Sequence, residues 1–540
     1  MNLVNYDRRT MLKGSALGLL GVSMGHSGTT KAEGNSTNWN DSSSNSSAGC
    51  SSIEHKLNSL KGSGMYDHAT WGLLVIDPES GDVVHSLNQD QFFAPGSTAK
   101  LVPISAAWDT FGADHRFTTP VYRTGAVTDG RLNGDLVLVA SGDLTMGGRT
   151  LSNGKIAYTS IDHTYANAIP GATLTETNPL AGVDDLAAQV RKTGITRVEG
   201  DVLIDARLFE DNDILDPETP LSPILINDNL VDVLMTPTEP GQRAEVSHRP
   251  ETAAYHIWAD VATVGNDQET TVEVSSPQEG EIYVSGQIAA GEDPLLQVYQ
   301  VDDPAAFART ALIEALEEAG VEVAAPPTGP NPTTDLSGSG YQSSMKVAEH
   351  VSLPFSEYAE LILKTSHNLG ANLMVCLLAV EAGSNDCRDG FPVIYDFLTN
   401  VGIDTNEVSL SDGRGGARED HVTPQALVSL LSYWHGTPSA EAFAQTLPIL
   451  GVDGSLAEVA PDSPAAGHVF AKTGTVAGPD LLNNRIYLTA QTLAGYIDAV
   501  DGRKLAFGLF MNHASVENIE GVIEVADQLG ELTATLQQEC

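Results

Sequence analysis

The sequence predicts an α/β fold in which one domain, an antiparallel sheet with flanking helices, is split by a β-rich inserted region. Strand and helix patterns that fit one sheet stand near both ends of the chain. The middle carries mostly short strands and turns. A chain of 540 residues is also long enough for two or three domains with a sizeable core.

The first part of the split domain is predicted over residues 53–115. Apolar residues recur at helical spacing over 53–60. A hairpin pattern follows, with strands at 71–76 and 83–87. A Pro-Gly pair then precedes a second helix, whose buried side is predicted to carry Leu101, Ile104 and Trp108.

The inserted region is predicted over residues 116–345. In chain order, its strand patterns and helical stretches are strand 134–143, helix 183–193, strand 200–205, strand 281–290 and helix 304–319. It ends in a linker rich in Pro, Gly and Ser at 326–340.

The second part of the split domain is predicted over residues 346–540. Three strand-like runs stand at 484–490, 492–498 and 504–512. They precede a helix with one apolar stripe, made of Ile519, Val522, Val525, Leu529, Leu532 and Leu536. Both ends of the chain therefore fit one layered domain with the terminal helices on one face of its sheet.

The charge of the chain is strongly acidic. It has 71 acidic and 28 basic residues, a net charge of −43, and only 11 lysines. Such a surface repels nucleic acid and anionic membranes, so neither is expected as a partner. Dispersed acidic residues with scarce lysine are typical of proteins from extreme halophiles, where salt screens the self-repulsion.

The N-terminus, residues 1–32, is predicted to be a Tat-type export signal. Arg8 and Arg9 precede an apolar run far shorter than the roughly 20 residues that span a bilayer. No other segment is long and apolar enough to span one. We therefore expect an exported protein that is extracellular, periplasmic or tethered to the cell surface, and not transmembrane.

Residues 33–52 are predicted to form a Ser/Asn-rich linker. It contains three glycosylation sequons, at Asn35, Asn40 and Asn45, and Cys50, for which lipidation stays open. Export permits a disulfide between Cys376 and Cys387, but spacing alone cannot establish it. No Cys/His cluster has the spacing of a zinc site, so neither a metal nor an organic cofactor is expected.

A serine and a lysine stand three residues apart at the predicted start of the second helix, in 94-APGSTAKLVP-103. At that spacing Lys100 lies on the same helical face as Ser97 and can take its proton if burial or a neighbouring cation lowers the lysine pKa. A helix N-terminus also favours a developing oxyanion. Such a pair arises by chance about once in a chain of this length, so it decides nothing alone.

Two more motifs follow in the chain. Ser366-x-Asn368 lies in a predicted helical region, and 472-KTG-474, followed by Thr475, lies on a predicted edge strand facing the cleft. Ser-x-x-Lys, Ser-x-Asn and Lys-Thr-Gly, in this order, are the signatures of penicillin-recognising serine enzymes, which the chain therefore resembles.

Longer blocks narrow the resemblance to one group. They are 134–143, 227–237, 411–416, 448–456 and 493–496. These blocks resemble those of the class C low-molecular-mass penicillin-binding proteins, the D-alanyl-D-alanine carboxypeptidase/endopeptidases with extra domains between the first two motifs. The resemblance covers residues 55–540 and implies a β-lactamase/transpeptidase-like domain split by an insertion.

The resemblance implies a role for each motif residue. Ser97 would attack the carbonyl between two D-alanines, with Lys100 as proton acceptor. Ser366 would pass the proton to the leaving amine, and Asn368 would bind substrate backbone and orient Lys100.

The third motif is implied to bind substrate. Lys472 would supply positive potential, and Thr473 and Thr475 would hold the terminal carboxylate beside Gly474. The backbone N–H groups of Ser97 and Thr475 would form the oxyanion hole. The implied partners are a peptide ending in D-Ala-D-Ala or a related one and, as inhibitors, β-lactams.

Several residues depart from the pattern of the group. His367 and Asn372 stand where acidic residues are usual, and Leu144 replaces a proline. His367 is expected either to point outward or to tune the pH dependence of the cleft. Arg414 replaces a serine and is expected to be a surface turn residue. Residues 147–178 look inserted.

Three functions remain open at this point. The leading hypothesis is an exported serine D-Ala-D-Ala carboxypeptidase, with endopeptidase action on peptidoglycan cross-links as an open addition. The second is a β-lactamase-like hydrolase, esterase or D-amino-peptidase with the same nucleophile. The third is a surface protein with little turnover, against which the intact motifs argue.

Overall fold

The computed structural model describes residues 51–62, 64–210, 215–216, 219–338 and 340–539, which belong to one compact unit. The predicted signal, and the sequons and Cys50 of the predicted linker, lie outside the described residues, so the expectations about them stay predictions. None of the helices that are described is long and apolar enough to cross a membrane.

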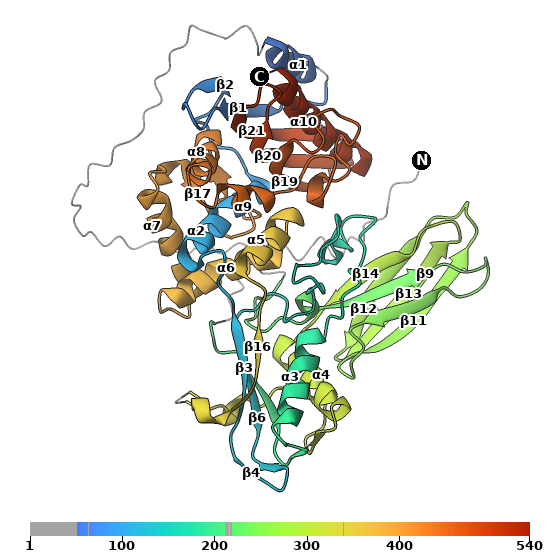
Figure 1. Ribbon diagram of the computed structural model, residues 1–540. Helices are drawn as coiled ribbons and strands as arrows, with labels where there is room; N and C mark the ends of the chain where they lie inside the picture. The colour runs from blue at the N-terminus through green and yellow to red at the C-terminus, as the bar shows by residue number, and fades with distance from the viewer. Residues whose placement is uncertain (1–50, 63, 211–214, 217–218, 339, 540) are drawn as a thin grey trace. The chain divides into compact units, whose positions relative to one another are not determined.

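The two ends of the chain meet in one five-stranded antiparallel sheet (Figure 1). Its strands, in spatial order, are β19 (Val469–Asp480), β20 (Arg485–Asp498), β21 (Lys504–Val516), β1 (Thr70–Ile76) and β2 (Val83–Leu87). β1 pairs with β21 from Thr70, opposite Asn512, to Ile76, opposite Ala506. The predicted split sheet is therefore confirmed, and β19 is its edge strand, as predicted.

The predicted strands at 484–490 and 492–498 are in fact one strand, β20. The prediction divided them at Gln491, whose backbone pairs with Thr475 on one side and Met511 on the other. The Gln491 side chain is buried, and its Oε1 accepts a hydrogen bond from Thr475 Oγ1 at 3.1 Å. A polar residue continues the strand here because its cross-strand neighbour is polar as well.

Helices cover both faces of the sheet. Successive residues of β1 point to opposite cores, Leu73 to one and Leu74 to the other. The terminal helices α1 (Ser51–Lys61) and α10 (Ile519–Glu539) pack in the first core, as predicted. The second core holds α2 (Leu101–Phe111), α5 (Phe355–Lys364), α6 (Asn368–Glu381), α7 (Gly390–Asn400), α8 (Pro424–His435) and α9 (Ala440–Gln445).

A disulfide joins Cys376 to Cys387, the pairing that the sequence left open. Cys376 lies in α6, and Cys387 begins the 3₁₀ helix η6 (Cys387–Asp389), just before α7. Both cysteines are buried in the helical core beside the sheet. The bond therefore ties α6 to the start of α7.

The inserted region contains small sheets with a core of their own. Its strands are β3 (Thr118–Arg123), β4 (Ala126–Thr128), β5 (Arg131–Asn133), β6 (Leu136–Val139), β7 (Arg197–Val198), β8 (Val202–Asp205), β9 (Leu230–Thr236), β10 (Glu245–Arg249), β11 (His256–Val264), β12 (Thr271–Gln278), β13 (Glu281–Ala289), β14 (Leu295–Gln300), β15 (Glu322–Val323) and β16 (Lys346–Val351). β16 pairs with β3, so strand pairing extends this region to Val351, past the predicted boundary at 345.

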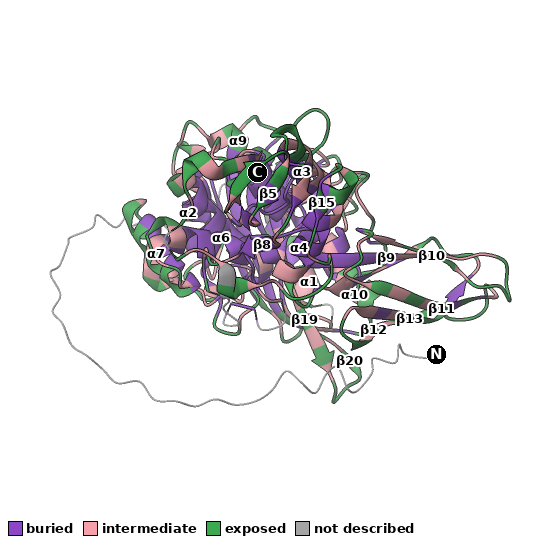
Figure 2. Cartoon of the chain, turned by 90° about the horizontal axis from the view of Figure 1, so that it is seen from below, coloured by how far each residue is buried: buried purple, intermediate pink, exposed green. Residues whose placement is uncertain are grey.

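Two helices of the inserted region, α3 (Ala181–Lys192) and α4 (Pro304–Glu318), match the predicted helical stretches. Each contributes one side to the core of this region. In Figure 2 the core residues are purple. β12 has only intermediate and exposed residues, whereas β11 includes the buried Val261 and Thr263. A short hairpin of β17 (Val408–Ser409) and β18 (His421–Val422) completes the strands of the helical half.

Candidate active site

Ser97 lies on the 3₁₀ helix η1 (Gly96–Lys100), which runs directly into α2. Gly96 has a positive φ of 52°, which favours glycine. A Cβ there would lie 3.0 Å from the Thr475 backbone nitrogen. Glycine thus lets the start of η1 lie directly against β19.

The Lys100 amine contacts residues of both the first and the second motif. Its Nζ lies 2.7 Å from Ser97 Oγ and 2.8 Å from Asn368 Oδ1. A third contact, of 2.9 Å, is to the Arg414 carbonyl oxygen. The structure therefore brings the first and second motifs together around one amine.

The electrostatics of Lys100 favour a neutral amine near neutral pH. The side chain is fully buried, and this burial lowers its pKa to about 7. Asp412 and Asp420 oppose the shift, whereas Arg414 adds to it. A lysine with this pKa can accept a proton where an exposed lysine cannot.

Ser366 lies in the bend between α5 and α6, and Asn368 is the first residue of α6. The prediction of a helical Ser366 is wrong, because its φ of 62° is left-handed. This conformation breaks the chain between the two helices. It brings the Ser366 hydroxyl to 2.9 Å from Lys472 Nζ, in the third motif.

The third motif lies on the edge strand β19. Lys472 is fully buried, and its Nζ donates to the Thr473 carbonyl at 2.8 Å as well as to Ser366. Burial, together with the charge of Lys100, lowers the pKa of Lys472 well below its ordinary value. The Thr473 hydroxyl is 2.7 Å from Ser455 Oγ.

The backbones of η1 and β19 approach closely at the implied oxyanion hole. A Cβ on Gly474 would lie 2.4 Å from the Pro95 carbonyl oxygen and 3.0 Å from the Ser97 nitrogen. Thr492 of β20 stabilises the junction, because its hydroxyl donates to the Pro95 carbonyl at 2.6 Å. The backbone nitrogens of Ser97 and Thr475 therefore lie at one junction of the fold.

Over the part of the chain that the structure describes, no group of three or more His, Cys, Asp or Glu side chains is arranged to hold a metal ion. The three motifs bring together two hydroxyls, of Ser97 and Ser366, and two buried amines, of Lys100 and Lys472.

The family is decided by a match over nearly the whole chain. The model of the D-Ala-D-Ala carboxypeptidase 3 (S13) family matches residues 54–535. The chain belongs to this family. It is a serine-type D-Ala-D-Ala carboxypeptidase.

Individual relatives are similar to this carboxypeptidase over most of their length. The D-alanyl-D-alanine carboxypeptidase of an Actinomadura species is 27% identical over 469 residues, 82% of this chain and 78% of the relative. DacB of Haemophilus influenzae is 21% identical over 468 residues, 83% of this chain and 86% of the relative. The solved structure of Haemophilus influenzae penicillin binding protein 4 has a TM-score of 0.64 at 21% identity, covering 87% of this chain and 97% of that one, so the folds agree.

The structure changes the interpretation of two unusual residues of the carboxypeptidase. His367 does not point outward: it is fully buried, and its Nε2 lies 3.0 Å from Asp228 Oδ1. Arg414 lies in a turn, as predicted, but its guanidinium pairs with Asp216 at 2.9 Å and Asp412 at 3.2 Å. Both side chains therefore face buried carboxylates, and each pairing keeps a buried polar group from being left without a partner.

Two further departures, Leu144 and Asn372, are buried. Leu144 is part of the helical core. The Asn372 Oδ1 accepts a hydrogen bond from the Gly413 N–H at 2.8 Å. Its Nδ2 is buried and has no hydrogen-bond partner among the described residues.

Sequence reasoning missed Asp412 and Asp228. The Asp412 carboxylate accepts hydrogen bonds from the backbone of Arg414, Gly415 and Gly416, which directs the Arg414 carbonyl to Lys100. The Asp-Gly pair of this turn was a usable signal. For Asp228 there was only the run Asn-Asp-Asn, which predicts a turn and not a partner.

Proposed function

We propose that this carboxypeptidase works through an acyl-enzyme on Ser97, with Lys100 as the base. The contacts of Lys100 Nζ with Ser97 Oγ and Asn368 Oδ1 carry this proposal. Lys100 takes the hydroxyl proton as Ser97 Oγ forms a bond to the carbonyl carbon between the two D-alanines. The lowered lysine pKa supports this role, because a substantial fraction of the amine is neutral near pH 7.

The leaving group then needs a proton. Ser366 passes its hydroxyl proton to the departing D-alanine amine as the C–N bond breaks, and it takes a proton from Lys472 Nζ, 2.9 Å away. The proton that Lys100 took from Ser97 restores Lys472, so Lys100 is neutral again before deacylation. Water afterwards hydrolyses the ester on Ser97. The tetrahedral oxyanion of each step is stabilised by the backbone N–H groups of Ser97 and Thr475.

Lys472 binds the terminal carboxylate of the substrate, with Thr473 and Thr475 beside it. In the free protein burial lowers the pKa of Lys472, which disfavours its charged form. A substrate carboxylate raises that pKa again, because opposite charges favour each other in a buried site. Substrate binding and proton uptake by Lys472 are therefore coupled.

The setting of the reaction is outside the cell. The twin arginine of residues 1–32 supports export, and the acidic composition supports a salty medium. A peptide substrate of peptidoglycan type and inhibition by β-lactams, which mimic D-Ala-D-Ala and stop at the acyl stage, follow from the same site.

The test is intact-protein mass after incubation with benzylpenicillin in high salt, with Ser97→Ala as the matched control. A stable adduct on the wild-type chain alone is expected, and hydrolysis of D-Ala-D-Ala peptides and cross-linked peptides is then measured. Penicillin consumed without an adduct would instead indicate a β-lactamase-like hydrolase. Intact penicillin without an adduct would contradict recognition of this ligand class.

A further inference from the structure

The loop that carries Ser366 and Asn368 is held from the inserted region. The Tyr165 hydroxyl donates a hydrogen bond to the Ser366 carbonyl oxygen. His367, between the two motif residues, contacts Asp228. Tyr165 lies in the 3₁₀ helix η2 (His163–Tyr165) and Asp228 just before β9, so both anchors come from between the first and second motifs.

Ser366 needs such anchors. Its left-handed φ of 62° is uncommon for a residue with a side chain, and such conformations persist where surrounding contacts enforce them. The Tyr165 hydroxyl fixes the Ser366 carbonyl directly. The Ser366 side chain is thereby directed to Lys472.

His367 uses both ring nitrogens on this loop. Its Nδ1 accepts a hydrogen bond from the Gly370 N–H at 2.9 Å and therefore carries no proton. Its Nε2 then carries the ring proton and donates it to Asp228 Oδ1 at 3.0 Å. One nitrogen caps α6 and the other ties the cap to the inserted region. Because Asn368 is the first residue of α6, both contacts help to place its amide.

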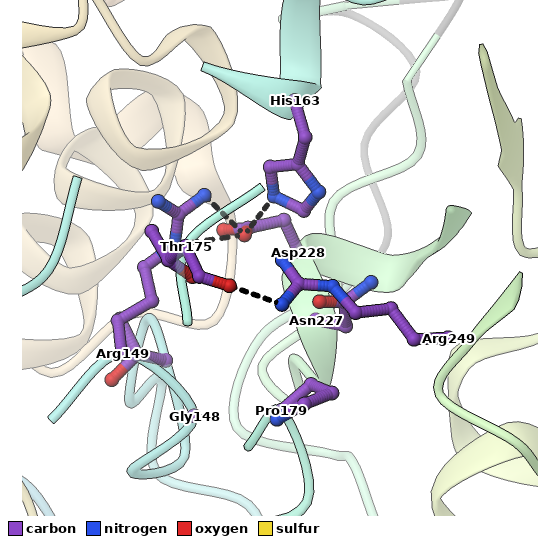
Figure 3. A pocket seen from close by; sticks show the side chains of 9 residues that line it. Gly148, Arg149, His163, Thr175, Pro179, Asn227, Asp228 and Arg249 are labelled. Carbon is purple, nitrogen blue, oxygen red and sulfur yellow. Dashed lines mark hydrogen bonds and ion pairs between the residues drawn. The ribbon is translucent and has the colours of Figure 1, made fainter. Parts of the chain in front are cut away.

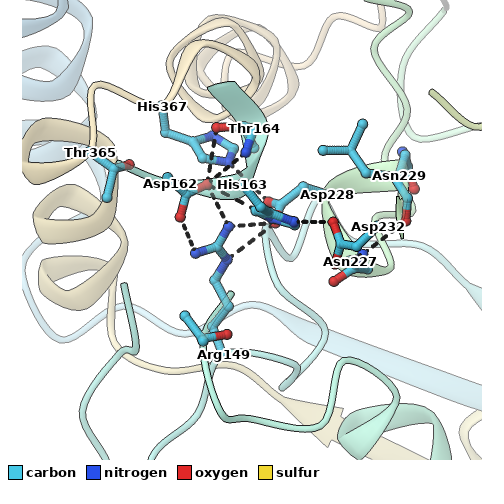
Figure 4. A network of polar contacts seen from close by, with 12 residues as sticks. Arg149, Asp162, His163, Thr164, Asn227, Asp228, Asn229, Asp232, Thr365 and His367 are labelled. Carbon is cyan, nitrogen blue, oxygen red and sulfur yellow. Dashed lines mark hydrogen bonds and ion pairs between the residues drawn. The ribbon is translucent and has the colours of Figure 1, made fainter. Parts of the chain in front are cut away.

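Asp228 is itself rigidly held (Figure 4). Its Oδ2 accepts hydrogen bonds from Arg149 Nη2 at 2.8 Å and from His163 Nε2 at 2.9 Å. Burial raises the pKa of Asp228, but the Arg149 guanidinium together with His367 and His163 outweighs it and holds the pKa well below its ordinary range. The ionised Asp228 carboxylate makes four hydrogen bonds, two with Arg149, one with His163 and one with His367. It therefore holds the His367 ring in place.

The surrounding charges balance, which argues against a ligand site here. Arg149 pairs with Asp162, and Arg249 pairs with Asp232. Burial disfavours the charged form of His163, but Asp232 and Asp162 raise its pKa to about 10. The cavity between these groups measures about 10 Å³, room for one water molecule at most (Figure 3).

We propose that Tyr165 and His367 are positioning residues that set Ser366 and Asn368 against the two catalytic lysines, so that the inserted region governs acylation. This inference rests on the proposed acyl-enzyme. A shift of about 1 Å in a positioned group costs on the order of 10²-fold in rate. The contacts of Lys472 with Ser366, and of Lys100 with Asn368, are the ones at risk.

The experiment compares Tyr165→Phe, His367→Asn and the double variant with wild type. His367→Asn keeps a side-chain acceptor for the Gly370 N–H but removes the imidazole donor to Asp228. Tyr158→Phe is the matched control, since the Tyr158 hydroxyl belongs to the same segment, 147–178, but contacts Glu360 of α5 instead. Time courses of acylation by benzylpenicillin give the rate constant k2 and the binding constant K separately.

We expect k2 to fall about 10- to 100-fold in each single variant, with a much smaller change in K and no change in Tyr158→Phe. The final adduct yield separates misplacement from unfolding, because unfolded protein lowers the yield and not the rate. The double variant should lose less than the product of the single losses, since both residues hold one loop.

Three results overturn the inference. Unchanged k2 in both single variants, with wild type acylated normally, would leave the proposed function intact and remove the positioning role. Losses that multiply in the double variant would show that the two residues act separately. A wild-type chain that forms no adduct would overturn the proposed acyl-enzyme and this inference together.

Discussion

Lys100 is buried on every side, and its burial governs how its amine titrates. The pKa is lowered to about 7, so the neutral amine that can accept a proton predominates above that pH. The rate of acylation by benzylpenicillin should therefore rise with pH through about 7 and level off above it. Stopped-flow rates between about pH 5.5 and 8.5 measure this, and a flat profile would contradict the role of Lys100.

A second group at the same site titrates in the same range. Burial and the neighbouring Asp412 raise the pKa of Asp420 to about 7. The variant Asp420→Asn distinguishes the two groups, because it removes that titration and leaves Lys100 in place. The rising limb should persist in this variant; its loss would assign the limb to the carboxyl group.

At the residue scale, the motif residues were predictable because chemistry fixes both their types and their spacing. Ser97 and Lys100 lie three positions apart, so a helical turn already brings them together. His367 could not be placed in this way, since its partner Asp228 is 139 positions away. Only the folded inserted region brings that carboxylate to the loop.

At the scale of elements, the contact between η1 and β19 depends on Gly474. In Gly474→Ala the new Cβ would lie 2.2 Å from Thr492 Oγ1 and 2.4 Å from the Pro95 carbonyl oxygen. The backbone must shift where Ser97 and Thr475 meet, so acylation should be largely lost and the free energy of unfolding should fall by about 1–3 kcal/mol.

Gly478 provides the matched control on the same strand. A Cβ at Gly478 meets no atom within 4 Å, so Gly478→Ala should keep both the acylation rate and the stability. Equal losses in the two variants would mean that β19 tolerates no alanine, and the close approach to η1 would not be the cause. Acylation rates and urea denaturation measure both effects.

The disulfide between Cys376 and Cys387 supports α6, which begins at Asn368. Its two cysteines are 11 positions apart, and closing a loop of that size contributes about 2–3 kcal/mol in the chain-entropy account. The double variant Cys376→Ser and Cys387→Ser should lose about that much stability in urea denaturation. Reduction of the disulfide in the wild-type chain should lower its stability as well. An unchanged urea midpoint after reduction would contradict the prediction.

Elements with a clear apolar periodicity could be predicted, but the pairing between strands could not. The apolar stripe of α10 follows from the helical period alone. The continuity of β20 through Gln491 depends on its cross-strand neighbour Thr475, and the pairing of β16 with β3 depends on a strand over 200 positions earlier. Pattern within one segment cannot show such partners.

At the scale of the whole molecule, buried and exposed charges respond differently to dissolved salt. In the cluster around Asp228 three buried carboxylates face the buried Arg149 and His163 and the partly exposed Arg249. Buried pairs of this kind are screened little by dissolved salt. The excess negative charge of the chain must therefore act through its exposed carboxylates.

The net charge of −43 predicts a protein whose stability depends on salt. The screening length falls from about 10 Å at 0.1 M to about 3 Å at 1 M, so repulsion between exposed carboxylates weakens most over that range. The midpoint of thermal unfolding should rise steeply between 0.1 and 1 M KCl. Sucrose at matched osmolarity is the control, because it favours burial without screening charge. A midpoint that rises equally in sucrose, or that does not rise in KCl, would contradict self-repulsion as the force that salt relieves.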